Sequence, residues 1–210
     1  MTVNIAIADA TDLALEGIRA VLRDQPAFQV VGAYFCLAEL LDALPQARPD
    51  VILLGDRLEP ESDVLTVSER LLAAAPRARL IVLSTLADGH LVQELFAVGA
   101  LAFLHKYDPL RHHLIEAIHT VIRGRPYLSP SANSAYLLAM QSGQNTPHLN
   151  AEAREVLRQM AQGLRPQEIA LRRGVSVRRI YSVCEKLRRR FGAETNAQLI
   201  ALAAEEGFLP

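Results

Sequence analysis

Short apolar runs and amphipathic segments alternate through the first 124 residues of the chain. The apolar runs have the length of strands that are buried on both faces, and they are Val3–Ala8, Gln29–Ala33, Val51–Leu54, Leu80–Leu83 and Ala102–Leu104. A segment with helical periodicity follows each run, in the order Leu13–Arg23, Leu37–Leu44, Val64–Ala74, His90–Val98 and Leu110–Arg123. This alternation predicts an α/β domain in which helices cover both faces of a doubly wound, five-stranded parallel sheet.

Residues 149–210 follow a different pattern, because only helical periodicity is found there. Four short helices are predicted, over Ala151–Gln162, Arg165–Arg173, Val177–Phe191 and Asn196–Glu206. Gly174 ends the second of these helices, and Ser176 can cap the third. A helix that stops and restarts so abruptly is typical of a helix-turn-helix. We therefore expect a small all-α helix-turn-helix domain here.

Polar sequence containing Pro, Gly and Ser separates the two patterns. It runs from Gly124 to Asn133 and again from Gln141 to His148, with a short helix predicted over Ser134–Gln141. The expected organisation is a first domain over residues 1–124, a linker over residues 125–148 and a second domain over residues 149–210.

The net charge of −1 over 210 residues hides an asymmetry between the two halves. Residues 1–148 carry 11 basic and 16 acidic side chains, a net charge of −5, whereas residues 149–210 carry 11 basic and 7 acidic side chains, a net charge of +4. Nine basic side chains but only two acidic ones fall between Arg165 and Arg190. Such a density on a helix-turn-helix indicates binding to the phosphate backbone of double-stranded DNA.

The composition excludes several classes of protein. With 50% hydrophobic and 21% charged residues, the chain is not expected to be disordered. Its apolar runs are far shorter than the roughly 20 residues of a membrane span, and no basic segment precedes an apolar stretch at the N-terminus, so neither a membrane association nor a secretory signal is expected. Cys36 and Cys184 belong to no CxxC or Cys/His cluster, which favours free thiols in a reducing cytoplasm.

Four polar residues of the first domain each follow an apolar run directly or within two positions: Asp9, Asp56, Ser84 and Lys106. The carboxyl ends of parallel strands are where such sheets place their sites. A carboxylate that accepts a phosphoryl group needs a cation near the incoming oxygens, an ammonium for the charge of the product and a hydroxyl that follows the phosphate. The four residues supply these groups.

The same positions resemble the receiver domain of response regulators. The resemblance is carried by Ile7–Ile18, Asp56–Asp63, Val82–Ser84 and Gly99–Lys106. It implies that Asp56 is the phospho-acceptor and that Asp9 and Asp56 are metal ligands. It also implies that Ser84, Phe103 and Lys106 form the switch, with Phe103 as the aromatic that moves with the hydroxyl.

Two positions differ from the receiver pattern. Ala10 stands where receivers usually carry a second acidic residue, so a Mg²⁺ site at Asp9 and Asp56 would lack one carboxylate. Counting forward from the start of the third predicted strand places Gly55 at the acceptor position, whereas counting back from the later landmarks places Asp56 there. The difference matters because a slip of one residue reverses the face of a strand. We favour Asp56, because four later landmarks (Pro60, Asp63, Ser84 and Lys106) select it and one earlier landmark, Pro49–Asp50, does not. An extra residue or a β-bulge before Asp56 would reconcile the two counts.

Residues 149–209 resemble the LuxR-type DNA-binding domain, through Leu149–Leu164, Gln167–Ala170, Arg190–Gly192 and Ala197–Leu199. A receiver followed by such a domain is the architecture of the NarL/FixJ subfamily of response regulators. Helical periodicity turns Ile180, Val183, Leu187 and Phe191 toward the core. The residues expected to contact DNA are Ser176, Arg178, Arg179, Tyr181, Ser182, Glu185, Lys186, Arg188 and Arg189.

The predicted recognition helix departs from its family. Tyr181 stands where the family usually has Lys, and Val183 where it usually has His, so an unusual operator is expected. Glu185 either accepts from a cytosine amino group or pairs within the helix with Arg188 or Arg189.

The sequence thus predicts a DNA-binding transcription regulator of two-component type that works as a homodimer and is not an enzyme. Asn196–Glu206 is the helix expected to pair between DNA-binding domains. The receiver-like domain would control pairing or DNA binding, either through a sensor histidine kinase or, given Ala10, without phosphorylation. Two alternatives remain: a phosphoryl-transfer enzyme that uses Asp56, and an interaction scaffold with a vestigial DNA-binding domain.

Overall fold

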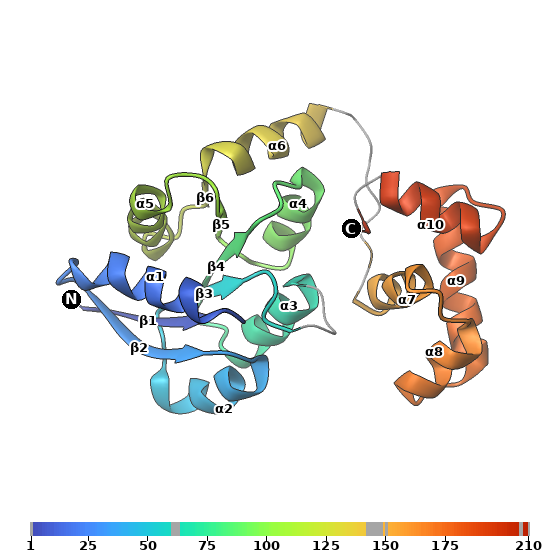
Figure 1. Ribbon diagram of the computed structural model, residues 1–210, viewed down its shortest axis with the longest axis horizontal. Helices are drawn as coiled ribbons and strands as arrows, with labels where there is room; N and C mark the ends of the chain where they lie inside the picture. The colour runs from blue at the N-terminus through green and yellow to red at the C-terminus, as the bar shows by residue number, and fades with distance from the viewer. Residues whose placement is uncertain (1, 60–63, 142–148, 150, 206–207, 210) are drawn as a thin grey trace. The chain divides into compact units, whose positions relative to one another are not determined.

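The computed structural model describes the chain except for residues 1, 60–63, 142–148, 150, 206–207 and 210. Two compact units divide it, Met1–Gln144 and Asn145–Pro210 (Figure 1). The first unit contains β1 (Val3–Ala8), α1 (Asp12–Arg23), β2 (Phe28–Tyr34), α2 (Leu37–Ala47), β3 (Val51–Gly55), α3 (Val64–Ala74), β4 (Arg79–Ser84), α4 (Gly89–Ala97), β5 (Ala102–His105), α5 (Leu110–Ile122), β6 (Tyr127–Leu128) and α6 (Pro130–Gln141). The second contains α7 (Ala151–Ala161), α8 (Pro166–Arg173), α9 (Val177–Phe191) and α10 (Asn196–Glu205).

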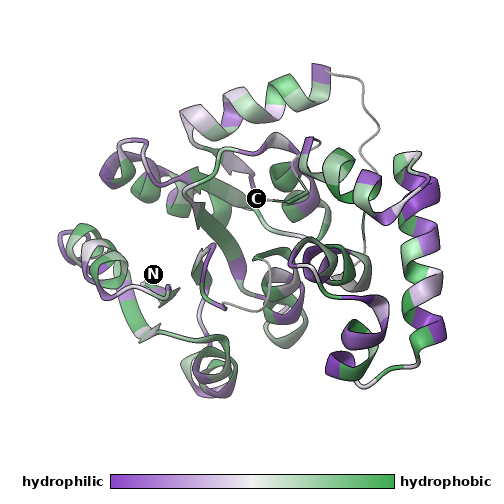
Figure 2. Ribbon diagram, turned by 45° about the vertical axis from the view of Figure 1, so that its right-hand side comes forward, coloured by the Kyte–Doolittle hydropathy of each residue, from purple (hydrophilic) through white to green (hydrophobic). Residues whose placement is uncertain are grey.

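The first unit is built on one parallel sheet with the strand order β2-β1-β3-β4-β5-β6. Alternate side chains of each central strand enter different apolar layers, because successive residues of a strand face opposite sides. In β1, Ile5 and Ile7 pack with α1 and α5, whereas Ala6 and Ala8 pack with α2, α3 and α4. The inner strands are therefore buried on both faces, and the ribbon of the sheet is mostly green, the colour of hydrophobic residues, in Figure 2.

The sheet has six strands in the structure, so the predicted count of five is wrong by one. The additional strand, β6, pairs in parallel with β5 through Tyr127 and Leu128. A strand of only two residues, lying between Pro126 and Pro130, is too short to produce an alternating pattern, which is why the sequence did not reveal it.

Residues 127–141 are packed structure, although the sequence indicated a linker over 125–148. After β6, α6 begins at Pro130 and lies close against α4. A β-carbon at Gly89 of α4 would stand 2.2 Å from the carbonyl oxygen of Ala135 and 2.7 Å from the β-carbon of Ala139. The absence of a side chain at Gly89 therefore permits the close approach of the two helices, a tertiary contact that composition does not show.

The second unit packs its four helices around one apolar core that includes Leu157, Ile169, Ile180, Leu187 and Leu199. No helix in the described part of the chain is long and apolar enough to cross a membrane.

Candidate functional site

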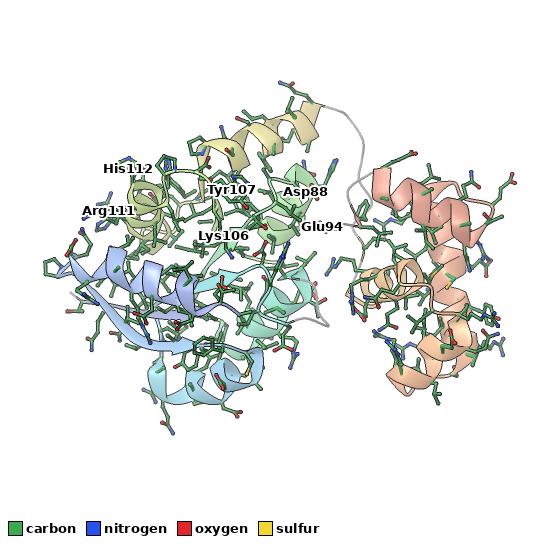
Figure 3. The ribbon with its side chains drawn as sticks, in the orientation of Figure 1. Asp88, Glu94, Lys106, Tyr107, Arg111 and His112 are labelled. Atoms are coloured by element: carbon green, nitrogen blue, oxygen red, sulfur yellow. The ribbon has the colours of Figure 1, made fainter. Side chains whose placement is uncertain are left out.

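Four strand-end residues of the first unit meet at the carboxyl edge of the sheet. Asp9 follows β1, Asp56 follows β3 and Ser84 ends β4. Lys106, which is labelled in Figure 3, follows β5. The ammonium nitrogen Nζ of Lys106 lies 2.8 Å from Oδ2 of Asp9 and 3.1 Å from Oδ1 of Asp56. Parallel strands bring their carboxyl ends to one edge, which explains how residues so far apart in sequence come together.

Asp56 is held from several sides. Its Oδ2 accepts hydrogen bonds from Oγ of Ser84 at 2.8 Å and from the backbone N–H of Thr85 at 3.0 Å. Burial alone would raise the pKa of this carboxyl, but the positive charge of Lys106 and the hydrogen bonds together outweigh burial and lower the pKa. Asp56 is therefore a stable carboxylate.

Lys106 is the counter-ion of both carboxylates. The side chains of Asp9 and Asp56 are 5% and 8% exposed, whereas that of Lys106 is 22% exposed. Burial would lower the pKa of Lys106, yet its hydrogen bond to Asp9 and the two negative charges raise it. The three groups thus form a mostly buried ion cluster with a net charge of −1.

Two neighbours of these residues, Thr85 and His105, belong to the same site and were missed by the sequence reasoning. The carbonyl oxygen of Thr85 lies 3.1 Å from Nε2 of His105, and the backbone N–H of His105 donates to Oγ of Ser129 at 2.9 Å. The available signal was their position, one residue beyond Ser84 and one before Lys106. Phe103, the aromatic expected to move, is fully buried in the layer beneath α4.

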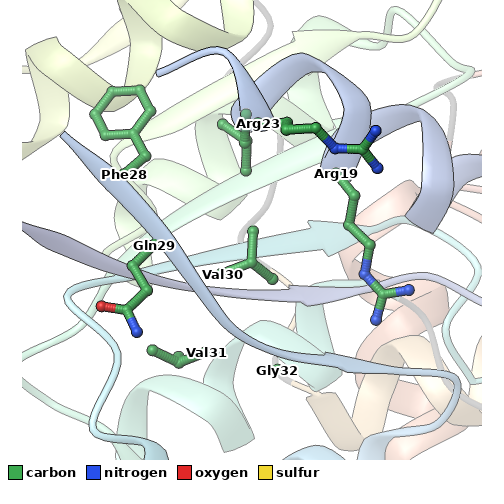
Figure 4. A pocket seen from close by; sticks show the side chains of 8 residues that line it. Arg19, Arg23, Phe28, Gln29, Val30, Val31 and Gly32 are labelled. Atoms are coloured by element: carbon green, nitrogen blue, oxygen red, sulfur yellow. The ribbon is translucent and has the colours of Figure 1, made fainter. Parts of the chain in front are cut away.

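An open pocket lies on the first unit between α1 and the edge strand β2 (Figure 4). Its volume is about 490 Å³, and it is lined by Arg19, Arg23 and residues 28–32 among others. Its lining carries two guanidinium groups but no carboxylate, thiol or imidazole, so it holds none of the expected site residues.

The helix-turn-helix of the second unit is formed by α8 and α9. Gly174 ends α8 in the left-handed conformation at φ +63°, and Oγ of Ser176 caps α9 by accepting from the backbone N–H of Arg179 at 3.3 Å. The core side of α9 is formed by Ile180, Val183, Cys184, Leu187 and Phe191. Cys184 is buried, and this burial raises the pKa of its thiol.

Most residues expected to contact DNA lie on the exposed side of α9. They are Arg178, Arg179, Tyr181, Ser182, Glu185, Lys186 and Arg189, with the cap Ser176 also exposed. Arg188 differs, because it is half-buried and donates to Oδ1 of Asn196 at 2.8 Å, which joins α9 to α10. Glu185 pairs with Arg189 at 3.2 Å rather than with Arg188.

Known proteins resemble the chain over nearly its whole length. No family model matches. The "uncharacterized transcriptional regulatory protein YxjL" of Bacillus subtilis is 26% identical over 99% of this chain and 97% of its own length. The DNA-binding transcriptional activator DevR/DosR of Mycobacterium tuberculosis is 25% identical over 97% and 94%. A solved structure of RcsB from Salmonella enterica, bound to the rprA promoter with phosphomimetic BeF₃⁻, superposes with a TM-score of 0.73 at 21% identity, over 97% and 99%.

The relatives found are response regulators of the NarL/LuxR family, and the chain is similar to them over nearly its whole length.

The third strand, β3, contains no bulge. It pairs with β1 and with β4 in unbroken register up to Leu54 and Gly55 respectively, so the β-bulge that would reconcile the two counts is absent and an extra residue is the alternative that remains. A β-carbon at Gly55 would stand 2.1 Å from Oδ2 of Asp9. The carboxylate of Asp9 therefore fills the space that a side chain at position 55 would take, and Asp56 reaches the site from the turn after the strand.

The donor set at the carboxyl edge of the sheet does not fit the Mg²⁺ ion that the fold family implies. Mg²⁺ requires near-octahedral oxygen ligands. Ala10 offers a methyl group, and Nζ of Lys106 already bridges the carboxylates of Asp9 and Asp56. Within the described residues, no group of three His, Cys, Asp or Glu side chains could hold a metal. Two carboxylates that are both paired with Lys106, and no third acidic side chain among the residues described at this edge, make a poor set of ligands for Mg²⁺.

The predicted recognition helix, α9, has one partner that the sequence reasoning missed. Nε2 of Gln167, in the first turn of α8, donates to the phenol oxygen Oη of Tyr181 at 2.8 Å. Gln167 was noted only as part of the family resemblance. Its contact with Tyr181 depends on how α8 crosses α9, which the sequence pattern does not give.

Proposed function

We propose that this chain is a sequence-specific, DNA-binding transcription regulator that reads double-stranded DNA with α9. The observation that carries the proposal is the exposed side of α9, which presents the cations of Arg178, Arg179, Lys186 and Arg189 together with the polar side chains of Tyr181, Ser182 and Glu185. The cations can hold phosphates while polar side chains of the same face reach the base edges. The named transcriptional regulators among the relatives support this reading.

Binding of the full chain to duplex DNA, measured by fluorescence anisotropy against salt concentration, tests the proposal. Four phosphate contacts per protomer, eight in the proposed dimer, predict a slope of about −7 in log K against log salt. Arg178→Gln should weaken binding to all sequences and make this slope shallower by about 2, one contact per protomer. The matched control is Arg123→Gln, an exposed arginine of the first unit, which should leave binding unchanged. Absence of salt-sensitive binding at any sequence would refute the proposal.

In this proposal the unit Met1–Gln144 is the receiver-like domain and the unit Asn145–Pro210 is the DNA-binding domain. The chain binds as a homodimer through α10, whose exposed face is a row of small residues: Ala197, Ala201 and Ala204. Dimers are described for RcsB bound to DNA. Ala201→Glu should lower the affinity for a two-half-site duplex while sparing a single half-site.

The receiver-like domain works without phosphoryl transfer in this proposal. Three features support it. Gly55 is the last residue of β3 and stands where the forward count places the acceptor. Ala10 replaces the usual second acidic residue, and Lys106 is already paired with Asp9 and Asp56. Incubation with acetyl phosphate and Mg²⁺ should give no adduct by mass spectrometry. An adduct of one phosphoryl group, about 80 Da, that disappears in Asp56→Asn would overturn it and identify Asp56 as a phospho-acceptor served by a sensor kinase.

A further inference from the structure

The exposed side of α9 carries a row of three hydrogen-bonding side chains spaced one helical turn apart. They are Tyr181, Glu185 and Arg189, and Tyr181 is 47% exposed. Residues four positions apart lie on the same face of a helix. Because the N-terminal part of a recognition helix lies nearest the base edges, Tyr181 and Glu185 are placed to meet bases and Arg189 to meet the backbone.

The contact with Gln167 determines what Tyr181 can offer to DNA. A phenol group has one proton to donate and an oxygen that can accept. Since the side-chain amide of Gln167 donates to Oη of Tyr181 at 2.8 Å, the oxygen is used as an acceptor and the phenol proton is left to donate. The group facing the groove is then a hydrogen-bond donor.

We infer that Gln167 is a positioning residue for base readout: it fixes the phenol of Tyr181 so that its proton is donated to an acceptor on the major-groove edge. This inference rests on the proposed DNA-binding function. The acceptors available there are N7 and O6 of guanine, N7 of adenine and O4 of thymine, whereas cytosine offers only an amino donor. The base opposite Tyr181 is therefore selected against cytosine.

Glu185 supplies the complementary preference one turn later. Its Oε1 accepts from Arg189 at 3.2 Å, and its second oxygen takes no part in that hydrogen bond. A carboxylate can only accept, so it matches the amino group of cytosine. The pair of residues predicts a half-site in which a base with an acceptor lies near a cytosine.

Selection of bound duplexes from a random-sequence pool, with the full chain, tests the inference. The informative variant is Gln167→Glu, because a carboxylate cannot donate and must instead accept the phenol proton of Tyr181. Oη then faces the groove as an acceptor, and the preference should move toward bases with an amino group. Tyr181→Phe removes the group altogether. The matched control is Gln162→Glu, which makes the same charge change at an exposed glutamine just beyond α7.

The expected results are specific to one base position. Gln167→Glu should change the preferred base there, with the original preference reduced about fivefold, the value of one hydrogen bond, and Tyr181→Phe should flatten the preference. The control should keep the wild-type motif. If the Gln167→Glu variant selects the wild-type motif, as the control does, the inference fails while the proposed DNA binding stands. If the wild-type chain selects no sequence and shows no salt-sensitive binding, the proposed function fails with it.

Discussion

Replacement of Lys106 by Met tests whether the ion cluster at the carboxyl edge of the sheet stabilises the receiver-like domain. Methionine keeps most of the length of the aliphatic stem but removes the ammonium group, which lies 2.8 Å from Asp9 and 3.1 Å from Asp56. Both carboxylates are then left with no cation at these distances, although their side chains are only 5% and 8% exposed. The charged form of a buried group is expensive unless it is paired.

The size of the effect follows from burial. Removing one partner of a buried ion pair costs about 3–5 kcal/mol, and the 22% exposure of Lys106 places the expected loss near the lower end, about 3 kcal/mol. With a urea dependence of about 2 kcal/mol per molar for a domain of this size, the unfolding midpoint of the first unit should fall by about 1.5 M.

Hydrogen–deuterium exchange at increasing urea, read from peptides of each unit, measures the two units separately in the full chain. The control is Lys186→Met, which changes the only other lysine of the chain, on the exposed side of α9, and should leave the midpoint of the first unit unchanged. In an Asp56→Asn background, the loss of unfolding free energy that Lys106→Met causes should be smaller by at least about 1 kcal/mol. A midpoint equal to wild type, or an equal loss in both backgrounds, would refute the reasoning.

Three further predictions use the same measurement. The pKa of Asp56 is below its ordinary value of 3.8. The stability that its ionised carboxylate contributes is therefore complete above pH 3.8 and is lost as the pH falls through the folded-state pKa. Asp56→Asn should make the free energy of unfolding of the first unit fall less steeply below about pH 4. Gly55→Ala places a β-carbon 2.1 Å from Oδ2 of Asp9 and should destabilise the first unit by about 1–3 kcal/mol; an unchanged midpoint would contradict it. Ser176→Ala removes the acceptor for the N–H of Arg179 and should cost the second unit about 1 kcal/mol, whereas Ser176→Asp should keep the cap.

The sequence by itself determined those elements whose own residues carry a strong local pattern. Five strands and the helices between them could be predicted, because each strand forms an apolar run. The inner strands are buried on both faces, whereas the edge strand β2 is mostly half-buried. The helix-turn-helix could be predicted because Gly174 and Ser176 act within a few residues of each other. Parallel topology then placed the ends of β1, β3, β4 and β5 at one edge, so Asp9, Asp56, Ser84 and Lys106 could be grouped before any coordinate was known.

Tertiary structure alone decided the details that depend on pairing and contact between distant segments. β6 exists only because two residues find an edge beside β5, and α6 packs only where Gly89 lets two helices approach. The register of β3 places Gly55 at the last position of the strand and leaves Asp56 in the turn after it. Counting along the chain could not resolve this difference of one residue. Likewise, the residue that orients Tyr181 lies fourteen positions away on another helix. Hydrophobic periodicity reports which face of an element is buried, but a hydrogen bond between side chains is set by the crossing of two elements, and that is fixed only when the core packs.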